Sequence, residues 1–351
     1  MPMNVFLKAT VACLFLHLAC HAYARQLSGT GPADLNAGRL KSEIRRIIRN
    51  ADADVGVTLI ADSPVSGKLG ANAGSGRKRR PYIIRINDFR MYPLMSVMKM
   101  HQALWVTDSL SRGGFSLDTG IAVADGDLKR DTYSPLRDSL LSDRNKRSWK
   151  VPVRTLLRYT LQLSDNNACD ILFRHFGGPS ATDRYIRSLG IEGFEIAVTE
   201  DQMHKDTGLC GANWSRPSSA AGLLRLMVTA GSAESGNELP GGASRKLSDN
   251  RHLGFVLQTM MTCTTGQDRL AAPLSGTGAA IGHKTGTGDK DSHGRIIGLN
   301  DAGFIILPDG RYYTLAVFVR NSRETPAATA RIIADISEAV YRHMTGNGKP
   351  E

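Results

Sequence analysis

The stretch Ser96-Val97-Met98-Lys99 carries the strongest clue to the fold and chemistry of this 351-residue chain. A serine hydroxyl is a weak nucleophile at neutral pH, so it needs a neighbouring base and hydrogen-bond donors that stabilise an oxyanion. Lys99 follows Ser96 by about one helical turn, which places its amine on the same face as the hydroxyl. Such a pair is common by chance, and its meaning depends on two later stretches, Ser164-Asp165-Asn166 and Lys284-Thr285-Gly286-Thr287. Together the three stretches predict an acylating serine, Ser96.

The second stretch supplies groups for proton transfer and binding. Ser164 has a hydroxyl that can pass a proton to a leaving nitrogen. Asn166 can hydrogen-bond both Lys99 and a substrate amide, and Asp165 is expected to fix the loop.

The third stretch lies in an apolar, strand-like context. The edge of such a strand can pair with an extended substrate, whose carboxylate Lys284 and Thr285 can hold. Gly286 is expected to let the substrate approach the backbone, and the amides of Ser96 and Thr287 are expected to form the oxyanion hole.

Hydrophobic patterning predicts strands near both ends of the chain and helices between them. The strand-like runs are 55–60, 82–86, 280–287, 304–307 and 312–319, and helices are expected at 40–48, from Ser96 onward and at 327–343. We therefore expect an α/β (α+β) fold, in which an antiparallel sheet built from the N- and C-terminal segments is flanked by helices and carries an inserted all-α lobe. The sheet lobe is expected over about 35–95 and 275–345, and the α lobe over about 96–274.

Residues 1–24 have the pattern of an export signal. A short positive region ends at Lys8, an apolar stretch runs from Ala9 to Cys20, and His21-Ala22-Tyr23-Ala24 resembles a cleavage site. A transmembrane helix needs roughly 20 apolar residues, so a membrane anchor is disfavoured. A lipoprotein signal is also disfavoured, because His17 stands where that signal requires an aliphatic residue. We expect a mature catalytic domain, residues 25–351, that is exported to the periplasm without stable membrane association.

The net charge of +11 raises the question of a nucleic-acid partner. The densest basic run is Arg77-Lys78-Arg79-Arg80, and the other positive charges are dispersed without interleaved aromatic residues. A solvated surface is therefore favoured over nucleic-acid binding.

Cysteine and histidine spacings give no indication of a metal site. Cys13 and Cys20 lie in the expected signal, which leaves Cys169, Cys210 and Cys263 with at most one intramolecular disulfide. The nine histidines form neither an H-x-H nor an H-E-x-x-H pattern. We expect neither metal nor cofactor.

The order of the three stretches resembles that of the penicillin-recognising serine enzymes. Glu200 stands 36 positions beyond Ser164, which resembles the position of the deacylating glutamate of class A β-lactamases. Glu200-Asp201-Gln202-Met203-His204 is similar to the sequence in the PER, VEB and CfxA branch. Further stretches with the same likeness are Asp131-Thr132-Tyr133-Ser134-Pro135-Leu136, Ser164-Asp165-Asn166-Asn167-Ala168-Cys169-Asp170 and His283-Lys284-Thr285-Gly286-Thr287.

This resemblance implies a monomeric serine β-lactamase with a small-molecule β-lactam substrate. Ser96 would attack the lactam carbonyl, Ser164 would protonate the ring nitrogen, and Glu200 would activate the hydrolytic water. Either Lys99 or Glu200 could take the proton from Ser96.

The resemblance also implies supporting roles around the cleft. His204 would help hold Glu200 or its water, and Tyr133 would form an aromatic wall at the cleft mouth. Arg269 would assist Lys284 with the substrate carboxylate, and Arg295 is the alternative for that task.

Departures from commoner class A enzymes imply a wider cleft that accepts bulky cephalosporins. Val198 stands where an arginine often pins the loop, Ala103 and Leu157 stand where a disulfide often lies, and the 68 positions from Ser96 to Ser164 exceed the usual separation. Two other functions stay open at this point. A D,D-peptidase acting on peptidoglycan shares the three stretches without needing Glu200, and a non-hydrolytic β-lactam sensor would stay acylated.

Overall fold

A five-stranded antiparallel sheet brings the two ends of the described chain together. In the computed structural model, which describes residues 37–61, 81–143, 145–232 and 247–346, the strand order is β2-β1-β10-β9-β8. The strands are β1 (Asp54–Ala61), β2 (Tyr82–Ile86), β8 (Ala280–Thr287), β9 (Leu299–Ile306) and β10 (Tyr312–Arg320). The expected fold class is confirmed. The expected signal at 1–24 and the basic run at 77–80 lie outside the described residues.

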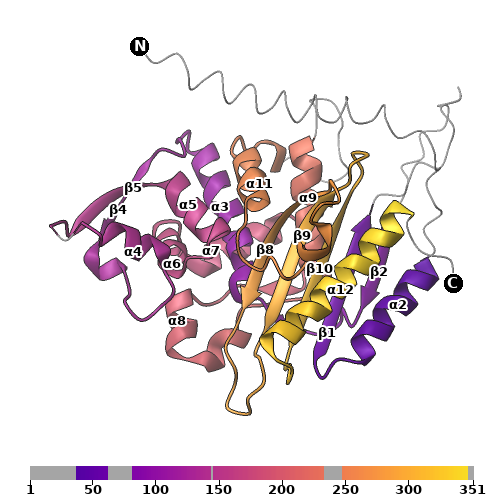
Figure 1. Ribbon diagram of the computed structural model, residues 1–351. Helices are drawn as coiled ribbons and strands as arrows, with labels where there is room; N and C mark the ends of the chain where they lie inside the picture. The colour runs from indigo at the N-terminus through magenta and orange to yellow at the C-terminus, as the bar shows by residue number, and fades with distance from the viewer. Residues whose placement is uncertain (1–36, 62–80, 144, 233–246, 347–351) are drawn as a thin grey trace, which may run out of the picture.

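Apolar residues on both faces of the sheet explain why helices cover it on two sides. On one face, Val57 and Val317 pack with α2 (Ala37–Arg49) and α12 (Pro326–Thr345). On the other face, Phe304 and Phe318 join the core of the helical lobe, and α9 (Pro217–Ser232) contacts β1, β9 and β10. Figure 1 shows α2 and α12 side by side on the first face. β8 is left at the edge of the sheet, next to the helical lobe.

The helical lobe is built around α3, which is buried along most of its length. Its helices are α3 (Met98–Arg112), α4 (Pro135–Leu140), α5 (Val153–Gln162), α6 (Asn166–His175), α7 (Gly178–Ser188), α8 (Glu200–Lys205) and α11 (Leu253–Met261). Short 3₁₀ turns are η1 (Met95–Val97), η2 (Asp125–Asp127), η3 (Thr207–Gly211) and η4 (Ala272–Leu274).

This lobe also contains two small sheets, so the expectation of an all-α lobe needs correction. β4 (Gly120–Ala124) pairs with β5 (Ser148–Pro152), while β7 (Trp214–Ser215) lies between β3 (Tyr92–Pro93) and β6 (Phe194–Glu195). Strands of two to five residues are too short to give a readable alternation in the sequence. The lobe boundaries near 96 and 274 stay a prediction.

β9 begins earlier than the sequence indicated. We expected a strand from Phe304, but the structure starts it at Leu299 and includes Asn300 and Asp301. Both polar side chains are fully buried and hydrogen-bonded, which a hydrophobicity pattern does not reveal. Across the described ranges, we find no helix that is long and apolar enough to cross a membrane.

Candidate active site

Ser96 lies in the 3₁₀ turn η1 rather than at the first turn of an α-helix, because α3 begins two residues later at Met98. Lys99 is fully buried in the first turn of α3. Its Nζ lies 3.1 Å from Ser96 Oγ, so the turn and the helix together produce the expected proximity.

The Lys99 amine also joins the three parts of the site. Its Nζ lies 2.6 Å from the Ser164 carbonyl oxygen, 2.7 Å from Asn166 Oδ1 and 2.9 Å from Glu200 Oε1. Ser96 Oγ donates to the same Glu200 oxygen at 3.2 Å. A buried cation is tolerated only when such partners replace water, and here each partner is a residue expected at the site.

The loop before α6 points Ser164 into the site. Ser164 has a left-handed φ of 60°. Asp165 is the N-cap of α6 and accepts hydrogen bonds from the amides of Ala168 at 2.8 Å and Leu136 at 2.6 Å. Burial raises the pKa of Asp165, which agrees with a structural carboxyl inside the loop. Ser164 Oγ consequently lies 3.4 Å from Lys99 Nζ and 3.0 Å from Lys284 Nζ.

Asp170 holds the segment that carries Glu200, a role that the sequence analysis missed. Its two carboxylate oxygens accept the backbone amides of Glu200 at 2.9 Å and Asp201 at 2.8 Å, at the start of α8. Burial, reinforced by the nearby Glu200, raises the pKa of Asp170 to about 7. The residue stood within the Ser164-to-Asp170 stretch, but the contact spans 30 positions and leaves no periodic signal.

His204 lies one turn after Glu200 in α8 and contacts Asp131. Its Nε2 is 3.3 Å from Asp131 Oδ2, and its side chain is 41% exposed. In the contacts described for Glu200, the carboxylate meets Ser96 and Lys99, and Asp170 holds its backbone amide. The role of His204 in holding Glu200 or its water stays a prediction.

Tyr133 is exposed beside the loop that carries Asn166. Its side chain is 57% exposed, and its carbonyl accepts the Asn166 amide at 3.1 Å. Thr132 Oγ1 accepts from Asn166 Nδ2 at 2.8 Å. An exposed ring on this loop fits the expected position at the mouth of the cleft.

On β8, Lys284 is fully buried and donates from Nζ to Ser164 Oγ at 3.0 Å and to the Thr285 carbonyl at 2.9 Å. Burial lowers the pKa of Lys284 to about 8. Gly286 also makes a close backbone contact that the sequence did not indicate, and its expected role toward substrate stays a prediction. A Cβ there would lie 2.7 Å from the Leu94 carbonyl oxygen and 3.0 Å from Met95 Cβ. Gly286 therefore lets β8 pack against the turn that carries Ser96.

Arg269 contacts the C-terminal end of β8, whereas the contacts described for Arg295 lie in the connection that follows β8. Arg269 Nη1 donates to the carbonyl of Gly286 at 3.0 Å, and Nη2 donates to Thr287 Oγ1 at 2.6 Å. The side chain is buried, which lowers its pKa. Arg295 instead forms an ion pair with Asp291 at 2.7 Å in the connection between β8 and β9.

The three cysteines in the described residues, Cys169, Cys210 and Cys263, are free and buried, so they form no disulfide with one another. In the same part of the chain, no group of three or more His, Cys, Asp or Glu side chains could hold a metal ion.

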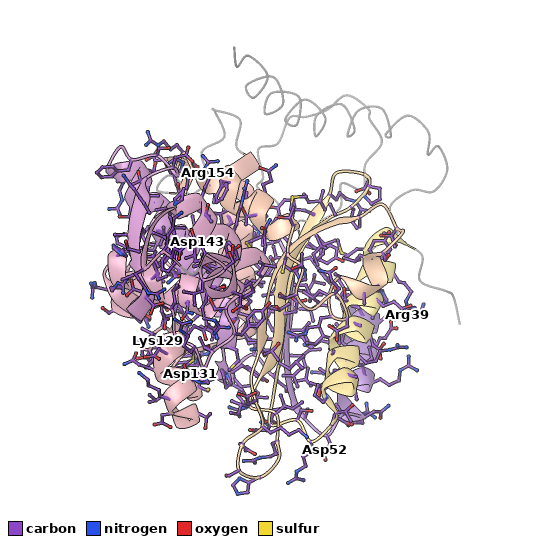
Figure 2. The ribbon with its side chains drawn as sticks, turned by 60° about the vertical axis from the view of Figure 1, so that its left-hand side comes forward. Arg39, Asp52, Lys129, Asp131, Asp143 and Arg154 are labelled. Carbon is purple, nitrogen blue, oxygen red and sulfur yellow. The ribbon has the colours of Figure 1, made fainter. Side chains whose placement is uncertain are left out.

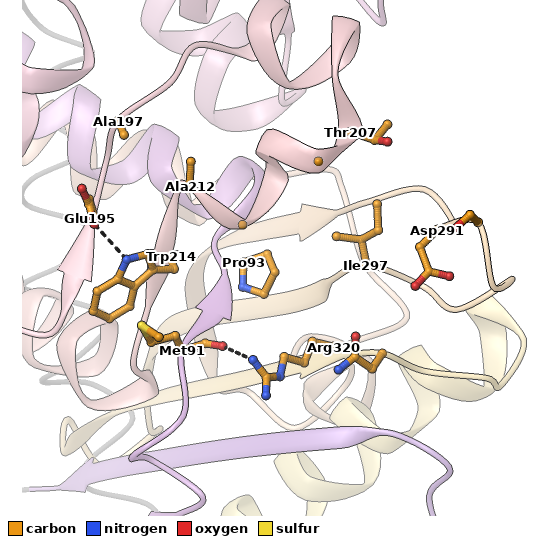
Figure 3. Close-up of a pocket in the computed structure, with 14 residues that line it drawn as sticks. Met91, Pro93, Glu195, Ala197, Thr207, Ala212, Trp214, Asp291, Ile297 and Arg320 are labelled. Carbon is orange, nitrogen blue, oxygen red and sulfur yellow. Dashed lines mark hydrogen bonds between the residues drawn. The ribbon is translucent and has the colours of Figure 1, made fainter.

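A cavity of about 720 Å³ lies beyond the Glu200 segment (Figure 3). Pro93 and Trp214 line it together with Ile297 from the β8–β9 connection and Thr207 from η3. Trp214 Nε1 donates to Glu195 Oε2 at 3.1 Å on one wall. The cavity therefore borders η3, the turn that follows the Glu200 helix α8.

Charges of both signs occur on both lobes. Figure 2 shows Arg39 and Asp52 on the side of the sheet, and Lys129, Asp131, Asp143 and Arg154 on the helical side. The interpretation of the basic balance as solvated charge stays a prediction.

Comparison with known proteins identifies the family to which the chain belongs. The family model described as "Beta-lactamase enzyme family" matches residues 39–344, so the chain belongs to the β-lactamase enzyme family. The fold and the arrangement around Ser96 place it with the class A serine enzymes.

Among its relatives, a "Beta-lactamase" of Bacteroides uniformis is 38% identical over 75% of this chain and 82% of its own length. "Extended-spectrum beta-lactamase PER-1" of Pseudomonas aeruginosa is 30% identical over 97% of this chain and 96% of its own. A solved class A β-lactamase from Bacteroides cellulosilyticus DSM 14838 is 33% identical, with a TM-score of 0.71 over 88% of this chain and 98% of that one. The solved TLA-1 extended-spectrum β-lactamase is 30% identical, with a TM-score of 0.73 over 88% and 99%.

Proposed function

We propose that this β-lactamase works through a Ser96 acyl-enzyme that Glu200 helps to hydrolyse. The observation that carries the proposal is the position of Glu200 Oε1, 3.2 Å from Ser96 Oγ and 2.9 Å from Lys99 Nζ. A carboxylate at that distance can hold a water against the acyl carbon. A transpeptidase or a non-hydrolytic sensor does not need a carboxylate that activates water to hydrolyse the acyl-enzyme.

Acylation begins when Ser96 Oγ loses its proton and bonds to the lactam carbonyl carbon. In the hydrogen-bond arrangement of the site, Lys99 donates to Ser96, and Ser96 donates to Glu200. Glu200 is therefore the acceptor of the serine proton in this arrangement, with the Lys99 ammonium stabilising the resulting charges.

Collapse of the tetrahedral intermediate breaks the lactam C–N bond. Ser164 Oγ, between Lys99 and Lys284, supplies the proton to the departing nitrogen and regains one from a neighbouring ammonium. Glu200 passes the proton taken from Ser96 to the Lys99 amine, 2.9 Å away, which has given its own proton to Ser164. Glu200 is then a carboxylate again and removes a proton from water as the water oxygen attacks the ester carbonyl. The amides of Ser96 and Thr287 stabilise the oxyanion in both steps.

The substrate carboxylate is proposed to lie at the end of β8. Thr285 and Thr287 offer hydroxyls there, and Lys284 and Arg269 supply positive charge. Because PER-1 and TLA-1 are named extended-spectrum enzymes, we extend the proposed substrates from penicillins to bulky oxyimino-cephalosporins. We also propose export to the periplasm, with removal of residues 1–24 and a monomeric mature protein.

Glu200→Gln tests the proposal. The purified variant should form a covalent adduct with a penicillin and release it at least about a hundredfold more slowly than the wild type, since general base catalysis typically contributes that much. Intact-protein mass spectrometry measures the adduct, and a chromogenic cephalosporin measures turnover.

The matched control is Glu192→Gln, the same change at an exposed glutamate. It should turn over like the wild type. Wild-type turnover by Glu200→Gln would remove Glu200 from the reaction, and a wild type that acylates once and stops would favour the sensor. If the wild type hydrolyses a penicillin but not an oxyimino-cephalosporin, the extension of the substrates to oxyimino-cephalosporins is wrong.

A further inference from the structure

A second polar network joins Cys263, Thr265 and His283, which the proposed reaction does not use, to the residues of the proposed carboxylate site on β8. The segment Cys263–Arg269 runs along the strand and contacts it at three points. Cys263 contacts His283, Thr265 Oγ1 lies 2.6 Å from Thr285 Oγ1, and Arg269 bonds Thr287.

Hydrogen bonds connect the buried sulfur to the proposed carboxylate site. Cys263 Sγ lies 3.3 Å from Thr265 Oγ1 and 3.7 Å from the Thr265 carbonyl. In the contacts from sulfur to Thr265 Oγ1 and from Thr265 Oγ1 to Thr285 Oγ1, either atom can be the donor. Each hydroxyl has a single proton, so fixing one donor in the chain fixes the next.

We propose that Cys263 and Thr265 are positioning residues for the carboxylate site, because the protonation state of the sulfur sets the direction in which the Thr265 and Thr285 hydroxyls donate. With a thiol at Cys263, the Thr265 hydroxyl is free to donate to Thr285 Oγ1, and the Thr285 proton is free for a substrate carboxylate. With a thiolate, Thr265 donates to sulfur and Thr285 donates to Thr265. In that state the Thr285 hydroxyl has no proton left to donate to the substrate carboxylate, and only its oxygen lone pairs face that group.

The charges around Cys263 make both states accessible near neutral pH. Burial lowers the pKa of His283, but the Asp301 carboxylate 3.0 Å away raises it to about 10, so His283 is an imidazolium. Burial raises the pKa of Cys263, but His283 and the charge of Lys284 lower it to about 7. These charges come from β8 and β9, and Arg269 is the charged group on the same segment that interacts with the sulfur.

The other two cysteines show that burial alone does not produce this state. Burial raises the pKa of Cys169 and raises that of Cys210 to about 11. Only Cys263, among these three, has the His283–Asp301 pair beside it.

The test compares Cys263→Ser with the wild type on one cephalosporin that carries its carboxylate, and it rests on the proposed function. A serine hydroxyl can donate like the thiol but does not ionise in this range. The ratio of kcat/KM, wild type over variant, should fall about threefold between pH 6 and 7.5, if losing one hydrogen bond to a charged group costs roughly tenfold. The Asp170 ionisation, which both proteins share, cancels in this ratio. The thiolate also raises the pKa of Lys284, and Thr265→Val, which keeps the thiol, separates that effect from the hydrogen-bond chain.

Three further variants give the comparison its controls. Cys210→Ser should give a flat ratio, and Thr265→Val should remove the pH dependence while leaving the thiol in place. Thr265→Ser keeps the hydroxyl and should restore the dependence, which a merely structural role would not do.

The ultraviolet absorbance of the thiolate, wild type minus Cys263→Ser, should titrate near pH 7. If the wild type hydrolyses the cephalosporin normally but the ratio of kcat/KM, wild type over Cys263→Ser, does not change with pH, this inference alone is overturned. Absence of hydrolysis of any β-lactam by the wild type would overturn the proposed function and this inference together.

Discussion

At the scale of single residues, the site depends on carboxyl groups kept in different environments. Asp165 is buried and Asp170 is half-buried, and both accept hydrogen bonds from backbone amides, whereas Glu200 faces the nucleophile. Asp170 combines a structural contact with an unusual ionisation, because burial and the neighbouring Glu200 raise its pKa to about 7.

This ionisation predicts a pH-dependent contribution to stability. Asp170 binds its proton more tightly in the folded state than in the unfolded state, so stability falls as the pH rises from the unfolded pKa of about 4 toward 7 and then levels off. Asp170→Asn removes that titration. The difference in unfolding free energy, wild type minus variant, should decrease by about 2 kcal/mol between pH 5 and 7.

Urea denaturation at pH 5, 6, 7 and 8 measures this difference. Asp138→Asn makes the same change at a side chain that is 67% exposed and should give no comparable trend. A pH-independent difference for Asp170→Asn would contradict the proposed ionisation.

At the scale of elements, the loop between α11 and η4 packs against β8, the strand that we propose binds substrate. Gly266 in this loop has a φ of 61°, and a Cβ there would lie 2.5 Å from Thr285 Cγ2. Gly266→Ala should displace Thr285 and lower kcat/KM for a cephalosporin about tenfold, the loss expected for one hydrogen bond to a charged group.

Gly276→Ala separates this collision from backbone strain. Gly276 has a φ of 73°, but a Cβ there meets nothing within 4 Å. Both variants should lose roughly 1–2 kcal/mol of stability to the left-handed conformation, and only Gly266→Ala should lose activity. Equal kinetics for the two variants would show that Thr285 tolerates the added methyl.

The sequence predicted those parts of the site that depend on short spacings. Ser96 with Lys99, and Lys284 with Thr285, are neighbours on one turn or one strand, so their motifs were readable. Asp170 and the Cys263–His283 contact could not be predicted in this way, because the pairing of distant elements creates them. Asp301 was harder still to predict as part of a strand, because its buried carboxylate interrupts the hydrophobic pattern of β9.

At the scale of the whole molecule, the core beneath α2 and α12 and the site around Ser96 lie on opposite faces of the sheet. Ile336 on α12 is fully buried in the core away from Ser96. Ile336→Ala should lower the unfolding free energy by about 2–5 kcal/mol through the cavity that it leaves. The kcat of the folded protein at 25 °C should stay within about twofold, since α12 makes no part of the site.

Thermal unfolding and turnover, measured on the same preparation, check this separation. Glu338→Ala, at an exposed position on the same helix, should change stability by no more than about 0.5 kcal/mol. A large loss of kcat in Ile336→Ala would mean that the two faces are coupled.

The central place of β10 also sets the timing of assembly during synthesis. β10 lies between β1 and β9, although it is the last strand of the described chain. A ribosome must therefore release residues as far as Arg320 before β1 meets this partner. Until that moment, β1 pairs within the sheet only with β2, and an isolated pair of strands is marginally stable in water. The nascent polypeptide consequently cannot complete its central sheet until residues as far as Arg320 have been synthesised, and the proposed export would be compatible with this late pairing.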